Sequence, residues 1–138
     1  MQRGIEVSKR IRWAPLPMFL RAKLVSSLVS PSALYGFPVA GLTQAFMNSL
    51  RTAVMSAVWG TRRKLRCREL VFTLLMPGHV VDPVQCAAYN SFLMLRRMLR
   101  KRPELRETFL HVWRARGEST STVPGPVGVI VTTLRRLG

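Results

Sequence analysis

Residues 82–102 read DPVQCAAYNSFLMLRRMLRKR, and this stretch combines a helix start with a two-sided helical pattern. Asp82-Pro83 is typical of a helix start, because aspartate caps free backbone N–H groups and proline suits the first helical position. At about 100° per residue the side chains that follow separate into two opposite faces. One face holds Val84, Ala88, Ser91, Phe92, Leu95 and Leu99, and the other holds Tyr89, Leu93, Arg96, Arg97, Arg100 and Lys101. The segment therefore predicts an amphipathic helix with one basic face.

Proline and glycine divide the rest of the chain into further helix-sized pieces. Residues 43–59 repeat apolar side chains at helical spacing, with Thr43 as a plausible N-cap and Gly60 at the expected end. Before them, Leu16-Pro17 opens an apolar helix that Pro31 either ends or kinks, because proline removes an internal hydrogen bond. Residues 70–75 predict a short apolar helix that Pro77-Gly78 stops, and Pro103 opens another helix that Gly117 ends.

No run of alternating strands is present, so we expect an all-α fold, an irregular bundle of about five to six helices. Residues 1–117 are predicted to form a basic helical domain. Residues 118–128 are rich in Ser, Thr, Pro and Gly and predict a linker. Residues 129–138 predict a truncated terminal element. Its valines favour a strand locally and residues 134–137 favour a helix, and of the two we prefer the helix.

The composition restricts the class of protein. The chain has 138 residues, 22 Lys and Arg against 6 Asp and Glu, a net charge of +16, and 48% hydrophobic residues. That apolar content excludes an ordinary disordered basic tail, which cannot bury enough surface to fold. Two cysteines exclude a disulfide-dense secreted scaffold. The composition and net charge favour a folded basic chain whose partner is a polyanion or an anionic surface.

Catalytic and metal-binding patterns are weak in this sequence. Asp82 is the only aspartate, which disfavours any mechanism that needs clustered aspartates to hold metal ions near phosphates. No Gly-rich phosphate loop is present. The chain does contain two thiols and two imidazoles, but every gap between them is too long for a zinc-finger site. These four are Cys67, His79, Cys86 and His111. We therefore expect no catalytic residue, no cofactor, no metal and no small-molecule substrate.

Two compact basic clusters give the strongest functional signal. Arginine dominates both, and its planar fork suits phosphate. Neutralising phosphates releases counterions, so such clusters give salt-dependent affinity for nucleic acid. Tyr89 lies on the basic face of its helix, where it could stack on a base. The first cluster is Arg62, Arg63, Lys64, Arg66 and Arg68, and the second is Arg96, Arg97, Arg100, Lys101 and Arg102.

A series of short motifs gives the chain a family resemblance. They are Leu16-Pro17, Arg21, Lys23-Leu24, Pro31, Leu34-Tyr35-Gly36, Leu50-Arg51, Trp59-Gly60, Pro77-Gly78-His79, Asp82-Pro83, Gly125-Pro126 and residues 134–138. This order resembles the C-terminal thumb-like region that follows the catalytic palm in reverse transcriptases of non-LTR, LINE-like retrotransposons. Leu-Tyr-Gly in a helical context is the most specific of the motifs.

The resemblance implies a thumb-like helical region that grips a template–primer duplex. Lys23 and Arg51 match basic positions of the family pattern and are expected to face that duplex. The family's catalytic Asp-Asp pair lies upstream of this region and does not occur in this chain. The resemblance therefore implies a non-catalytic fragment of an RNA-directed DNA polymerase, which binds RNA or an RNA–DNA duplex without sequence preference.

Two alternatives remain open. The first rests on residues 24–50, which contain no charged side chain, and on the basic N-terminus. Together they are compatible with a membrane-associated or organellar protein that has no enzymatic activity. Prolines, glycines and polar side chains disfavour a true membrane span there. The other alternative is a retroelement remnant without function. No signal-peptide core follows the N-terminus, and we expect an intracellular protein, nuclear or cytoplasmic and not secreted.

Overall fold

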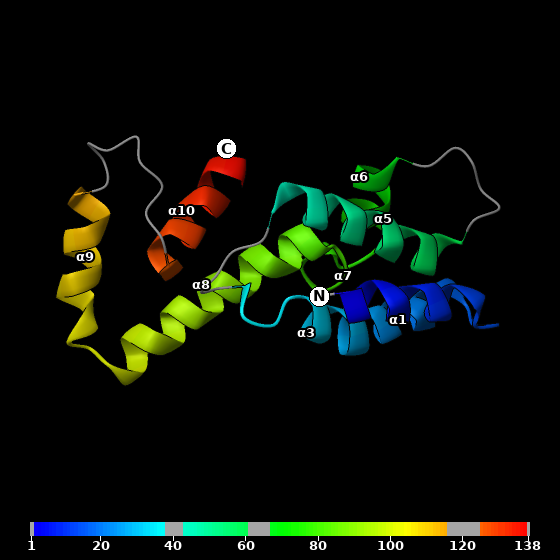
Figure 1. Ribbon diagram of the computed structural model, residues 1–138, viewed down its shortest axis with the longest axis horizontal. Helices are drawn as coiled ribbons and strands as arrows, with labels where there is room; N and C mark the ends of the chain where they lie inside the picture. Colours follow the sequence, from blue (N-terminus) through cyan, green and yellow to red (C-terminus); the bar gives the residue numbers. More distant parts are fainter. Residues whose placement is uncertain (1, 38–42, 61–66, 116–124, 138) are drawn as a thin grey trace. The chain divides into compact units, whose positions relative to one another are not determined.

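The computed structural model describes residues 2–37, 43–60, 67–115 and 125–137. Throughout these ranges the regular structure is helical and no strand occurs, which confirms the all-α class (Figure 1). The six longer helices of the described ranges agree with the predicted number. They are α1 (Gln2–Trp13), α2 (Met18–Leu24), α5 (Gln44–Trp59), α8 (Pro83–Lys101), α9 (Leu105–Ala115) and α10 (Gly125–Leu137). Shorter helices complete the set: η1 (Val25–Val29), α3 (Ser30–Ala33), α6 (Arg68–Leu70), η2 (Val71–Leu75) and α7 (Gly78–Val81).

The chain divides into two compact units rather than the single predicted domain over residues 1–117. Unit 1 comprises Met1–Tyr35 and Leu42–Ala87, and unit 2 comprises Gly36–Gly41 and Ala88–Gly138. The sequence does not indicate this division, because the boundary between Ala87 and Ala88 lies inside α8, where the helical pattern is continuous. The two basic clusters consequently belong to different units.

Helix α5 supplies much of the core of unit 1. Thr43 caps it as predicted, since its hydroxyl Oγ1 accepts a hydrogen bond from the Phe46 backbone N–H at 3.3 Å. Gly60 ends it with a φ of 87°, a left-handed conformation that glycine adopts without steric penalty. Between these ends one face of the helix is buried in a continuous apolar stripe. Its members are Met47, Leu50, Val54, Met55, Ala57 and Val58.

The helical path of α2 continues past Pro31 instead of ending there. The π-helical segment η1 precedes this proline, with the Ser30 backbone N–H bonded to the Val25 carbonyl five residues earlier. A π-turn widens the helix locally, and such turns occur mostly as single insertions within α-helices. Because proline has no N–H to donate and crowds the preceding turn, the wider turn lets α3 follow without a break. Val25 and Val29 point into the core.

Helix α1 lies against both α3 and α5 within unit 1 (Figure 1). The approach is tight at Gly4, where an added Cβ would lie 2.6 Å from Cβ of Ala33. Ser8 is fully buried one turn later and its hydroxyl donates to the Gly4 carbonyl at 2.9 Å. Small residues on one face of α1 therefore allow this helix to approach its neighbours closely.

The C-terminal part differs from its predicted boundaries. Helix α10 begins at Gly125, so residues 125–128 belong to a helix and not to the predicted 118–128 linker; residues 118–124 lie outside the described ranges. The predicted helical form of the terminal element agrees with α10. Gly125 has a φ of 83° at the start of this helix. Its local freedom allows Gly and Pro, which read as linker residues in sequence, to begin a helix.

Candidate nucleic-acid interface

The basic end of α8 is exposed, and it carries the second predicted cluster in unit 2. Four of its basic residues lie in the last turns of the helix and Arg102 follows directly: all five, Arg96, Arg97, Arg100, Lys101 and Arg102, are exposed. Tyr89, on the same helix, is 49% exposed. Among the described residues one carboxylate pairs with this cluster, since Glu104 Oε1 lies 3.3 Å from Arg102 Nη1. The sequence prediction therefore corresponds to a solvent-accessible group of cations with little local neutralisation.

The first predicted cluster lies mostly outside the described residues. This holds for Arg62, Arg63, Lys64 and Arg66, whereas Arg68 is described. Arg68 is exposed at the start of α6, next to Glu69. A backbone hydrogen bond at Glu69 holds the pKa of that carboxyl below its usual value, and the Cys67 thiol, Arg51 and Arg68 lower it further. Arg68 thus has an ionised carboxylate as its neighbour.

The two cations that the family resemblance pointed to have different surroundings. Lys23 is exposed on α2, and its backbone carbonyl accepts hydrogen bonds from Ser26 and Ser27. Arg51, by contrast, donates to both carboxylate oxygens of Asp82, from Nε at 2.9 Å and from Nη2 at 2.7 Å. Lys23 can therefore meet a ligand from solvent, whereas Arg51 is already bound to a carboxylate.

The pairing of Arg51 is structural in character. Asp82 is fully buried, so its charge depends on this bidentate partner. Arg51 Nη1 also lies 3.4 Å from Glu69, and its guanidinium lies 5.6 Å from the ring centroid of Phe72. The structure thus assigns Arg51 to joining α5, α6 and the start of α8. Arg51 is therefore engaged within the protein and is not free to bind a phosphate of a nucleic acid.

Asp82 serves α8 as predicted while it binds Arg51. Its Oδ1 accepts a hydrogen bond from the Val84 backbone N–H at 3.2 Å, which is the N-cap interaction expected from Asp82-Pro83. Sequence reasoning explained Asp82 by this cap alone and missed its ion pair. The two partners lie 31 residues apart, and no local spacing rule connects them.

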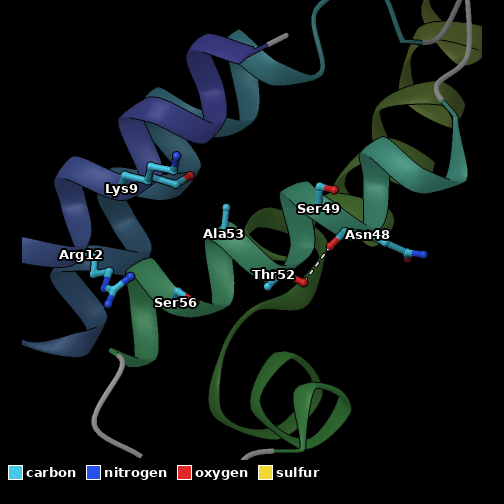
Figure 2. Close-up of a pocket in the computed structure, with 8 residues that line it drawn as sticks. Lys9, Arg12, Asn48, Ser49, Thr52, Ala53 and Ser56 are labelled. Carbon is cyan, nitrogen blue, oxygen red and sulfur yellow. Dashed lines mark hydrogen bonds between the residues drawn. The ribbon is translucent and has the colours of Figure 1, made fainter.

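A second group of polar and basic side chains lies in unit 1, in a pocket between α1 and α5 that the sequence did not predict (Figure 2). Its volume is about 480 Å³. Helix α1 contributes Ser8, Lys9 and Arg12, and α5 contributes Asn48, Ser49, Thr52, Ala53 and Ser56. Which helix α1 packs against is a tertiary property that spacing along the sequence does not reveal.

The described residues show neither a metal-ligand cluster nor a membrane-spanning helix. Nowhere in these ranges do three His, Cys, Asp or Glu side chains gather as metal ligands would. In the same part of the chain, no helix combines the length and apolarity needed to cross a bilayer. The described residues contain two candidate binding surfaces: the cations at the end of α8, and the pocket between α1 and α5 with its cations and polar side chains.

Comparison of the chain with protein-family models, with curated proteins and with solved structures gives no match.

Proposed function

We propose that this chain is a non-catalytic nucleic-acid-binding protein that holds RNA or an RNA–DNA duplex by its phosphates, with little sequence preference. One observation carries the proposal: five cations are exposed together at the end of α8 and Glu104 alone, among the described residues, pairs with them. A cluster of this kind gains free energy by releasing the counterions condensed on a nucleic acid. Contacts to phosphates carry no sequence information, so weak sequence preference follows.

The local chemistry supports a phosphate-binding role for α8. Arginine presents a planar fork of donors that matches two phosphate oxygens at once. Half-exposed Tyr89 lies on the same helix, and an aromatic ring there can pack on a base or a sugar. The motif order that resembles a retrotransposon reverse-transcriptase thumb supports the duplex as a ligand, and an intracellular site, nuclear or cytoplasmic, forms part of the same proposal.

A salt-dependence series tests the proposal. Affinity for an RNA–DNA duplex is measured by filter binding at several salt concentrations, with the full chain. Each lost phosphate contact lowers the slope of log K against log salt by about 0.9 on duplex DNA. For the variant that replaces Arg96, Arg97, Arg100 and Lys101 by Gln, we therefore expect a slope reduced by about 3.6 if each cation contacts one phosphate.

A matched control separates this contact from the general effect of charge. The control replaces four other exposed cations by Gln and thereby removes the same four charges; these are Arg3, Arg10, Arg106 and Arg114. We expect the control to keep most of the slope. If the two variants lose equal slope, α8 is not the contact surface. If the unaltered chain binds no duplex at low salt, the proposed function is wrong.

Membrane-surface binding is a second candidate, and a specific observation favours it. Several large apolar side chains of unit 1 are strongly exposed, among them Trp13 by 77%, Phe19 by 67% and Leu74 by 75%. Apolar side chains beside cations are typical of proteins that bind at an anionic lipid interface. Flotation with anionic vesicles tests this candidate, and a chain that floats as well with neutral vesicles, or not at all, contradicts it.

A further inference from the structure

The pocket between α1 and α5 has the chemistry of an anion site, and we propose that it binds a phosphoryl group carried on a small organic molecule or on a nucleic-acid end. All the residues of this site belong to unit 1 and none of them belongs to α8. This site is therefore distinct from the proposed nucleic-acid interface, and each of the two can be tested without the other.

The charge of the pocket has one sign. Its two ionisable lining residues are Lys9 and Arg12, and no carboxylate lines it. Both cations come from the same helix face, three residues apart, so they lie on neighbouring turns of α1. The opposite wall, formed by α5, contributes only neutral side chains. An anion entering here meets the positive charges of α1, and among the described residues no carboxylate lines the pocket.

Arg12 has a donor that the chain itself leaves unused. Its Nε is buried and has no hydrogen-bond partner in the structure. The guanidinium lies 5.1 Å from the ring centroid of Trp13, a cation–π contact that positions the group without using its N–H donors. Figure 2 shows Arg12 extending from α1 toward the end of α5 at Ser56. A movement of the Arg12 side chain that opens this N–H to the pocket would let a phosphate oxygen supply the acceptor that it lacks.

The α5 wall offers further hydrogen-bond donors. Ser49 and Ser56 present hydroxyl groups to the pocket, and hydroxyls can donate to phosphate oxygens. Asn48 is not one of these donors, because its side chain points away from Lys9 and Arg12 (Figure 2) and its Oδ1 accepts a hydrogen bond from the Gln44 side chain at 3.2 Å. Thr52 donates instead to the Asn48 carbonyl at 2.9 Å, as Figure 2 shows. The α5 wall thus offers the Ser49 and Ser56 hydroxyls as donors within a lining that also contains apolar surface.

The size of the pocket identifies the class of ligand. Its volume of about 480 Å³ lies in the range of about 300–1,000 Å³ that is usual for small-molecule sites. A single inorganic phosphate would fill only a small part of this space. The volume therefore favours a phosphorylated organic molecule whose phosphoryl group lies near the cations of α1. A nucleotide and the phosphorylated end of an oligonucleotide both have this chemistry.

Calorimetric titration of the full chain with inorganic phosphate is the first test, with chloride at equal ionic strength as the reference. The K9Q/R12Q variant should bind phosphate at least about tenfold more weakly, because it loses two charge-assisted contacts. The matched control R3Q/R10Q removes two exposed cations from the same helix, outside the pocket lining. We expect the control to change the affinity less than about twofold on the same scale.

The steric variant S49M fills the pocket from an exposed position of α5 without changing the charge. Binding of a phosphorylated organic molecule such as adenosine monophosphate should be weakened in this variant, while its helical circular dichroism and thermal unfolding stay like those of the unaltered chain. Equal losses in K9Q/R12Q and R3Q/R10Q, unchanged binding in S49M, or no binding beyond chloride would each overturn the proposal.

Two sources of the phosphoryl group are then compared. A short oligonucleotide with a 5′-phosphate and the same oligonucleotide without it are titrated beside adenosine monophosphate. Tighter binding that depends on the 5′-phosphate assigns the site to a nucleic-acid end, and binding of the monophosphate alone assigns it to a free nucleotide. If none of the three competes with inorganic phosphate, the site does not take organic phosphates and the inferred ligand class is wrong. The α8 charge variant should leave the affinities for inorganic phosphate and adenosine monophosphate unchanged, and it should keep the difference between the two oligonucleotides.

Discussion

At the scale of single residues, Asp82 shows how one side chain can satisfy two parts of the fold. It is fully buried, it caps α8 through the Val84 N–H, and it accepts two hydrogen bonds from Arg51. A buried carboxylate without a partner is costly, since neither water nor a neighbouring cation compensates the loss of hydration. The stability of unit 1 therefore depends on Arg51 more than on an ordinary surface cation.

Replacing Arg51 by Met tests this dependence. Methionine keeps an apolar side chain near Phe72 but leaves Asp82 buried and unpaired, so we expect a loss of about 3 kcal/mol in the free energy of unfolding. Denaturant unfolding measures the change. The control is Arg102→Gln, which breaks an exposed pair with Glu104 and should cost less than about 1 kcal/mol. Similar small losses in both variants would show that the buried pair is not a major source of stability.

Sequence reasoning succeeded at residues whose role is local. Thr43 and Asp82 were expected to cap helices, and both accept the expected backbone hydrogen bonds. Capping involves atoms two or three residues apart, so spacing reveals it. The partner of Arg51 is 31 residues away and depends on how α5 meets the start of α8. No periodicity in the sequence encodes that meeting.

At the scale of elements, the packing of α1 on α3 depends on the missing side chain of Gly4. A Cβ at this position would lie 2.6 Å from Cβ of Ala33, well inside normal contact. Glycine inside a helix ordinarily costs about 1 kcal/mol relative to alanine. Close approach of the two helices is the physical reason for keeping it there.

The variant Gly4→Ala sets helix propensity against this steric limit. Overpacking typically costs about 1–3 kcal/mol, which equals or exceeds the gain in propensity, so we expect a net decrease in thermal stability. Adding Ala33→Gly to the same chain removes the opposing Cβ and should restore most of the lost stability. Calorimetric unfolding of the two variants measures both effects. Stabilisation by Gly4→Ala alone would show that the two helices can separate without cost.

Helix boundaries were predicted well where proline or glycine acts alone, and less well where neighbouring turns compensate. The sequence left open whether Pro31 ends or kinks its helix, and the π-helical turn of η1 carries the path onward to α3. Similarly, residues 125–128 appeared to be linker but belong to α10. In both cases the burial of later residues, such as Ala33 and Ile130, favours the helix over local propensity.

At the scale of the whole molecule, the helices differ in how much of their surface is covered. Helix α5 buries six residues, whereas α9 buries none. Phe109 and Trp113 of α9 stack on each other, with ring centroids 5.8 Å apart. They belong to an apolar face of α9, yet no residue of this helix is buried. Helices with little buried surface open more readily than core helices.

Amide hydrogen exchange should therefore distinguish these two helices. We expect protection factors in α9 at least about tenfold lower than those in the central turns of α5. Mass spectrometry of peptides from each helix, taken from the intact chain, measures the difference. Equal protection would indicate that α9 is covered in solution by a surface that the described residues do not supply.

Charge, periodicity and capping depend on neighbouring residues, so the all-α class, the helix caps and the positions of the basic clusters can be predicted from the chain alone. The tertiary structure decided which cations can meet a ligand. It buried Asp82 against Arg51, left the cations at the end of α8 exposed, and joined Lys9 and Arg12 to the polar wall of α5. The physical reason is that burial and long-range pairing arise only when segments distant in sequence pack together.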